Sequence, residues 1–203
     1  MSESAKRIRR TPEQARRLIL DAAEACMGSA GPAGLRLTQV AEKAGISHPT
    51  LLHHFGSREG LIRALYQRTI AELRAALIGA LRGAPDAETD SIALVFRTYR
   101  EGLAQRLVWM IQSGADFGPN PQGTSVLEEI AQELHAVRLR LGSTAPIEDS
   151  RAIVHLSIIA AFGDAIIGDR LRRLAGQNEP EARPRFEHWL GALINAHVEA
   201  TLK

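Results

Sequence analysis

The stretch from Gly45 to Phe55 (Gly-Ile-Ser-His-Pro-Thr-Leu-Leu-His-His-Phe) constrains the fold more than any other part of this 203-residue chain. Just before it, residues 38–44 place apolar side chains at the three- and four-residue spacing of a buried helical stripe: Val40, Ala41 and Ala44. Gly45 suits the left-handed position that ends a helix, and Ser47 is a good N-cap for the next one. The stretch therefore predicts two short helices joined by a glycine turn, which is a helix-turn-helix.

The second of these helices has two different faces. Its inward face is apolar and consists of Ile46, Leu51 and Phe55. Its outward face carries hydrogen-bonding and small rigid groups, namely His48, Pro49, Thr50, His53 and His54. Because no acidic side chain lies on that outward face, the helix can approach a phosphate backbone without repulsion. In a helix-turn-helix the second helix enters the major groove of DNA, so this face predicts DNA binding.

From about residue 11 to residue 71 the chain resembles the DNA-binding domain of TetR-family transcriptional regulators. The family pattern runs Val-Ala-x-x-Ala-Gly-[Val/Ile]-Ser, then Thr-Leu-Tyr-x-His-Phe, then Ser-Lys-Glu-x-Leu. Here the three segments read Val-Ala-Glu-Lys-Ala-Gly-Ile-Ser (40–47), Thr-Leu-Leu-His-His-Phe (50–55) and Ser-Arg-Glu-Gly-Leu (57–61). Leu52 stands where the family has a phosphate-contacting Tyr, Arg58 replaces the usual Lys, and Arg36 replaces a small hydroxyl residue.

The resemblance implies a set of DNA-binding residues. The outward face makes His48, Pro49, Thr50 and His53 the candidates for base edges or thymine methyl groups. By family position, Thr38, His54 and Arg58 are candidates for phosphates, with Arg36 added because of its charge. Ser47, the cap of the reading helix, completes the set. The charge distribution agrees, because residues 1–60 hold nine Lys or Arg against six acids, although the whole chain has a net charge of only +2.

Turn signals divide the chain into four parts. These are a basic flexible arm (1–10), the helix-turn-helix domain (11–57), a connecting helix (58–82) and a second domain (83–203). The helix-turn-helix domain opens on Thr11-Pro12-Glu13-Gln14, which has the pattern of a capping box. A stripe of Ala15, Leu18, Ile19, Ala22 and Cys26 is expected to be the buried face of the first helix.

The second domain shows helical periodicity throughout. Its expected helices are 90–104, 105–115, 124–141, 149–174 and 184–201. The helix from Arg151 is apolar on nearly every side, so it requires cover on every side. The resemblance implies that this helix and the last one pair with their copies in a second subunit, although a buried helix of a monomer fits the same pattern. The fold class predicted is all-α, with an N-terminal helix-turn-helix domain and a C-terminal helical domain for ligand binding and dimerisation.

A sequence-specific DNA-binding transcriptional regulator follows from these features. The resemblance implies a repressor that binds a palindromic operator, an inverted repeat in double-stranded DNA, as a homodimer, and that a small-molecule effector releases. The walls and polar groups expected for the effector pocket are Phe96, Tyr99, Trp109, Met110, Gln112, Phe117, His155 and Asp164. A buried Asp164 requires a partner, which is an arginine, the dimer seam or a cationic ligand. An activator, or an interaction protein that binds no DNA, fits the same fold.

A helical metalloenzyme is the remote alternative, and it rests on Glu128, Glu129, Glu133 and His135. A di-iron bundle needs Glu-x-x-His on each of two helices, whereas Gln132 occupies the required Glu position and no second copy exists. We therefore expect no enzymatic activity, metal or cofactor. The single cysteine, Cys26, excludes an internal disulfide and fits a small buried apolar group. With no signal peptide and no membrane span expected, a cytoplasmic location is predicted.

Overall fold

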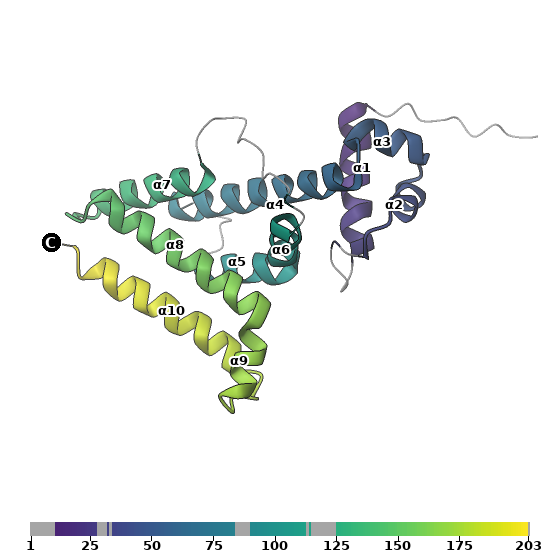
Figure 1. Cartoon of the computed structure of the whole chain (residues 1–203). Helices are drawn as coiled ribbons and strands as arrows, with labels where there is room; N and C mark the ends of the chain where they lie inside the picture. Colours follow the sequence, from purple (N-terminus) through teal and green to yellow (C-terminus); the bar gives the residue numbers. More distant parts are fainter. Residues whose placement is uncertain are drawn as a thin grey trace, which may run out of the picture. The chain divides into compact units, whose positions relative to one another are not determined.

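A computed structural model of the chain describes residues 11–27, 32, 34–83, 90–112, 114 and 125–202. All regular structure in these ranges is helical (Figure 1). The first four helices are α1 (Pro12–Met27), α2 (Leu37–Ala44), α3 (His48–Phe55) and α4 (Arg58–Leu81). The rest are α5 (Ser91–Thr98), η2 (Tyr99–Leu103), α6 (Ala104–Gln112), α7 (Val126–Arg140), α8 (Ile147–Gly163), η3 (Asp164–Gly168), α9 (Asp169–Leu174) and α10 (Ala182–Glu199).

The chain forms two compact units, whose boundary lies between Tyr66 and Gln67. That boundary falls inside α4, so the first turns of this helix belong to the N-terminal unit and the rest to the C-terminal unit. The basic arm expected at residues 1–10 lies outside the described residues.

The N-terminal unit begins with the expected capping box. The backbone N–H of Thr11 donates to Gln14 Oε1 (3.0 Å), and the N–H of Gln14 donates to Thr11 Oγ1 (3.2 Å). The buried face of α1 differs from the expected stripe, because Leu18 is exposed and Cys26 is half-buried. Its buried residues are Ile19, Leu20, Ala22, Ala23 and Met27. Helix α1 is therefore rotated toward Leu20 relative to the expected orientation, and its apolar face packs on α2.

In the C-terminal unit, the break expected between residues 104 and 105 is a kink further upstream. Helices α5 and α6 are joined through η2, where Gly102 has a φ of 120° and a ψ of −4°. Only glycine adopts such a backbone readily, so Gly102 sets the place of the kink. Tyr99, in η2, packs edge-on against Phe162 of α8 with 6.3 Å between ring centroids. The kink thereby places an aromatic side chain from η2 on the central helix of this unit.

Helix α8 continues through η3 into α9 without a break. Asp164, in η3, is buried and forms ion pairs with Arg172 and with Arg183 (3.8 Å to Nε). An arginine is therefore the partner of this carboxylate. Gly168 lies beneath the pair, because an added Cβ there would collide with the Asp164 carboxylate and lie 2.9 Å from Arg172 Nη2. The glycine thus leaves room for the ion pair.

Helix α10 is antiparallel to α8 and is tied to it at both ends. At one end Arg183 forms an ion pair with Asp169, and at the other His197 Nε2 lies 2.8 Å from Asp149 Oδ1. Between these ends α10 packs on α5, where a Cβ on Gly191 would meet Ile92 at an ordinary 3.9 Å. These contacts fix α8 and α10 as a pair of helices in one subunit.

A buried arginine joins the ends of three helices. Arg138, near the end of α7, is 1% exposed. Its guanidinium lies 2.6 Å from Asp149 Oδ2 in α8 and donates to Ser150 Oγ and Thr201 Oγ1, both at 3.0 Å. Burial raises the pKa of Asp149, but the hydrogen bonds from His197 and Arg138 outweigh it and hold this pKa below its ordinary value. The cluster is a buried ion pair supported by two hydrogen bonds from the guanidinium, while Arg138 Nε is buried without a hydrogen-bond partner.

The 28-residue run Ile147–Leu174 is long and apolar enough to cross a membrane on length and composition alone. A core helix of a soluble protein has the same properties, and this run packs on α5 and α7 within the C-terminal unit. The composition of one such helix is weak evidence for a membrane span.

Candidate nucleic-acid interface

The turn between α2 and α3 has the expected glycine geometry. Gly45 is left-handed (φ 65°, ψ 39°), and its N–H donates to the carbonyl of Glu42 at 3.0 Å. The N–H of Ile46 donates to the carbonyl of Ala41 at 3.0 Å, which closes the end of α2. The two helices are thus joined by a hydrogen-bonded turn, as a helix-turn-helix requires.

Helix α3 is capped and oriented as its sequence predicts. Ser47 Oγ accepts the backbone N–H of Thr50 at 3.2 Å and is 2.7 Å from the Thr50 hydroxyl. Leu51 and Phe55 are buried and hold the helix in the unit. The opposite face is exposed and carries four of the predicted reading residues: His48, Pro49, Thr50 and His53. His54 and Leu52 are half-buried at the edge of this face.

The start of α2 presents the other predicted phosphate contacts. Arg36 occupies its N-cap position in an extended conformation and makes no side-chain cap bond. Arg36 and Thr38 are both exposed. The first N–H groups of a helix have no intrahelical partner and attract anions, so a phosphate is a chemically suitable ligand for this end of α2.

Arg58 makes two contacts inside the protein. Its Nε donates to the carbonyl of Leu35 at 3.0 Å, and its Nη2 donates to the carbonyl of Pro32. These bonds tie the segment before α2 to the start of α4. Arg58 therefore holds the position of α2 as well as being a candidate for a phosphate contact.

The turn between α3 and α4 leaves no room for a side chain at Gly60. A Cβ there would overlap the backbone oxygen of Phe55 and lie 3.2 Å from its carbonyl carbon. Ser57 caps α4 by accepting the N–H of Gly60 at 3.1 Å. Hydrogen bonds from its own backbone N–H and from Ser57 lower the pKa of Glu59, so this exposed carboxylate is charged at neutral pH. The end of α3 is therefore packed closely against the first turn of α4.

Arg16 contacts the end of α3, a contact that the sequence analysis did not predict. Its Nη1 donates to the carbonyl of His54 at 2.9 Å, and its guanidinium carbon lies 4.4 Å from the centre of the Phe55 ring. These partners are 38 and 39 positions away along the chain, so no local pattern could have identified the contact.

The residues predicted for the effector pocket differ in their burial within the described part of the chain. Phe96, Tyr99 and Met110 are buried in the core, and Trp109 is half-buried. The Asp164 carboxylate forms ion pairs with Arg172 and Arg183. Gln112 and His155 lie on the surface, and Phe117 lies outside the described residues.

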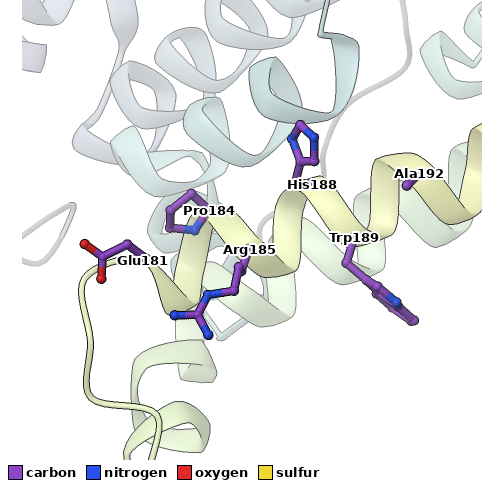
Figure 2. A pocket seen from close by; sticks show the side chains of 6 residues that line it. All are labelled: Glu181, Pro184, Arg185, His188, Trp189 and Ala192. Atoms are coloured by element: carbon purple, nitrogen blue, oxygen red, sulfur yellow. The ribbon is translucent and has the colours of Figure 1, made fainter.

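An open hollow of about 480 Å³ lies along α10 instead. Figure 2 shows that its lining comes from one helix and the residue before it: Glu181, Pro184, Arg185, His188, Trp189 and Ala192. None of the residues predicted for the effector pocket belongs to this set. A single helix face open to solvent lacks the enclosing walls of a small-molecule site.

The acidic residues of α7 form ion pairs with arginines. Glu128 accepts Arg151 Nε at 2.9 Å and Nη2 at 2.6 Å. Glu129 forms an ion pair with Arg74, and Glu133 lies 2.8 Å from Arg82 Nη2. These pairs join α7 to α4 and α8, so the acids that suggested a metal site have structural partners. Among the described residues, no group of three or more His, Cys, Asp or Glu side chains could hold a metal ion.

Similarities to known proteins agree with this geometry. Residues 19–65 match the family model described as bacterial regulatory proteins, tetR family. The chain is 28% identical over 169 residues to the HTH-type transcriptional regulator BetI of Brucella suis biovar 1, which covers 82% of this chain and 83% of that protein. It is also 28% identical over 134 residues to the HTH-type transcriptional regulatory protein RaaS of Mycobacterium tuberculosis, which covers 66% of this chain and 62% of that protein, less than two thirds of its length.

The fold is shared with solved structures along most of the chain. The TetR family repressor AlkX from Dietzia sp. superposes with a TM-score of 0.53 and 17% identity, covering 93% of this chain and 97% of AlkX. The capped reading helix and the all-helical architecture define a helix-turn-helix transcriptional regulator. Together with the family match, they show that residues 19–65 form a tetR-family DNA-binding domain, and the similarity to HTH-type transcriptional regulators extends along most of the chain.

Proposed function

We propose that this protein is a repressor that binds an inverted-repeat operator as a homodimer and releases it when a small-molecule effector binds. The observation that carries the proposal is the exposed face of α3, where His48, Pro49, Thr50 and His53 face solvent without an acidic neighbour on the helix. Contacts from such a face to base edges set the sequence read, while Arg36, Thr38, His54 and Arg58 contact phosphates and fix the register. AlkX, which shares the fold, is described as a repressor.

The dimer is inferred from an apolar surface on α8, α9 and α10. In the single chain these helices expose large apolar residues: Leu156, Ile159, Ile166, Ile167, Leu171, Leu174, Phe186, Trp189 and Leu193. Ile159 is 69% exposed and Leu174 is 77% exposed. Because so many large apolar side chains on these helices are costly to expose to water, a second copy of the same surface is their natural cover. Two reading helices then reach successive major grooves, about 34–36 Å apart.

The operator is tested by selecting bound sequences from a random DNA pool and measuring affinity across salt concentrations. Enrichment of one inverted repeat, with affinity that falls steeply as salt rises, is the expected result. His48→Ala should cost about 1–3 kcal/mol at one base position of each half-site. Equal weakening on every DNA sequence would remove His48 from the base-reading set, and failure to enrich any motif would contradict the operator.

The dimer is tested with Ile159→Arg, which places a charge on the apolar surface at a side chain that is largely exposed in the single chain. Light scattering should show a dimer for the wild type and a monomer for this variant, with loss of operator binding. Ile111→Arg is the matched control, since Ile111 is 62% exposed on α6, outside that surface. A dimeric Ile159→Arg protein would refute the assignment of the interface.

The effector and the direction of regulation need separate measurements. Release requires the effector to have a higher affinity for the conformation that does not bind DNA than for the one that does. A releasing compound must therefore bind the protein less tightly when operator DNA is present. A compound screen read out by operator release tests this. Transcription from the selected operator in the presence and absence of the protein separates repression from activation. We further propose that the protein acts in the cytoplasm, where its DNA lies.

A further inference from the structure

Arg16 holds the last two residues of the reading helix. It lies in the second turn of α1, and its Nη1 donates to the carbonyl of His54 at 2.9 Å. Its guanidinium carbon also lies over the ring of Phe55, 4.4 Å from the ring centre. One side chain thus makes a directional hydrogen bond and a face-on ring contact with two consecutive residues at the end of α3.

The His54 carbonyl is one of the helix-end groups that lack an intrahelical partner. The other capping bonds of α3 go elsewhere, since the N–H of Gly56 donates to Leu52 and the N–H of Ser57 donates to Phe55. Arg16 therefore donates to the His54 carbonyl, which receives none of these backbone N–H groups, and its positive charge lies at the negative end of the α3 dipole. The ring contact adds a cation–π interaction on a buried aromatic residue.

These two contacts fix how α3 is rotated about its own axis. Helix α3 has only eight residues, and its buried anchors are Leu51 and Phe55. A bond to a carbonyl at the end of the helix, combined with a contact on a ring at its side, resists both tilting and rotation. The reading residues His48 and His53 are on the same short rigid helix, so the direction of their side chains depends on the two Arg16 contacts.

We propose that Arg16 is a positioning residue for sequence recognition: it acts through α3, and it does so by its planar guanidinium rather than by its charge. The proposal rests on the proposed function, in which α3 reads DNA. A lysine retains the charge but has no planar group to donate to the carbonyl while stacking on the ring. Arg16→Lys therefore separates positioning from simple attraction to phosphate.

The experiment uses the full chain and three variants: Arg16→Lys, Arg16→Ala and Arg17→Ala. Arg17 is the matched control, because it is the neighbouring exposed arginine on the same helix. Affinity is measured for the selected operator and for an unrelated duplex across salt concentrations, at a temperature well below the unfolding midpoint of each variant. Amide hydrogen exchange of α3 is measured without DNA.

Arg16→Lys is expected to lower operator affinity about 10-fold, because misdirected side chains lose base contacts worth that much. Its affinity for unrelated DNA and its salt dependence should stay close to wild type, and exchange at the end of α3 should increase. Arg17→Ala should keep the wild-type ratio of operator to unrelated affinity. Because the readout is this ratio together with exchange, partial destabilisation of Arg16→Ala does not decide the outcome.

Three results would overturn the proposal. If Arg16→Lys keeps the wild-type ratio of operator to unrelated affinity and the wild-type amide hydrogen exchange of α3, the Arg16 contacts do not position α3. Equal loss on both DNAs in Arg16→Ala, with a salt slope reduced by about one and full rescue by lysine, would make Arg16 a phosphate contact instead. Wild-type protein that binds no sequence specifically, while exchange still responds to Arg16→Lys, would overturn the operator proposal and with it this role in recognition.

Discussion

Replacing Arg138 by alanine should destabilise the C-terminal unit more than any surface substitution. Arg138 is 1% exposed, and its guanidinium joins Asp149, Ser150 and Thr201 from α8 and the end of α10. The alanine variant removes the ion pair at 2.6 Å and both hydrogen bonds at 3.0 Å. It also leaves the buried hydroxyl of Ser150 without this donor.

The expected loss is about 3–5 kcal/mol in the free energy of unfolding, the usual cost of removing one partner of a buried ion pair. Asp149 retains its contact with His197 and is partly exposed, which places the expected value near the lower end of this range. In a unit of this size, each kcal/mol lowers the unfolding midpoint by about 2–8 °C. The midpoint of the C-terminal unit should therefore fall by roughly 6 °C or more.

Thermal unfolding followed by circular dichroism measures this change, with Arg140→Ala as the control. Arg140 is exposed on the same helix, two residues further on, so its removal should change the free energy of unfolding by less than about 0.5 kcal/mol. Equal midpoints for Arg138→Ala and Arg140→Ala would refute the assignment of Arg138 as a stabilising link between the three helix ends. The N-terminal unit holds no part of this cluster, so its helices should unfold at the wild-type midpoint if the two transitions separate.

Two further predictions concern a titrating group and a close approach. Hydrogen bonds hold the pKa of Asp149 below its ordinary value, so the charged carboxylate stabilises the fold at pH above that ordinary value, and this contribution is lost as pH falls through the lowered pKa. In Asp149→Asn, the free energy of unfolding should therefore fall less steeply on acidification than in the wild type. An unchanged profile would contradict the pairing. Gly60→Ala should destabilise the N-terminal unit by about 1–3 kcal/mol, despite the better helix propensity of alanine, because its Cβ would overlap the Phe55 carbonyl oxygen. Gly191→Ala, where the nearest atom lies at 3.9 Å, is the control and should be neutral or stabilising, so a Gly60→Ala protein that behaves like it would disprove the overlap.

The elements with strong local signals were predictable from sequence. The turn at Gly45, the cap at Ser47 and the capping box of Thr11 and Gln14 all have the expected hydrogen bonds. Each of these depends on residues within four positions of one another, so the chemistry can be recognised without knowing the fold. The apolar pattern of α8 also gave its position to within two residues at its start.

Features that depend on distant residues were not predictable. Leu18, Ile19 and Leu20 are consecutive apolar residues, and only packing on α2 decides that the helix buries the last two. Arg58 was predicted as a phosphate contact, but its bonds to the carbonyls of Pro32 and Leu35 depend on a fold in which those segments meet. Periodicity reports which face is apolar, but it does not report which groups lie across from it.

The ion pair above Gly168 has a consequence for how this sequence can diverge. Positions 164, 168 and 172 lie one turn apart on one continuous helix, and the glycine is required only while the other two retain the pair. A side chain at position 168 is therefore acceptable only after position 164 has lost its carboxylate. In the reverse order, the intermediate has a collision inside the protein. Lineages that have replaced Gly168 should thus lack the Asp164–Arg172 pair, and the order of the two substitutions along a phylogeny should be fixed.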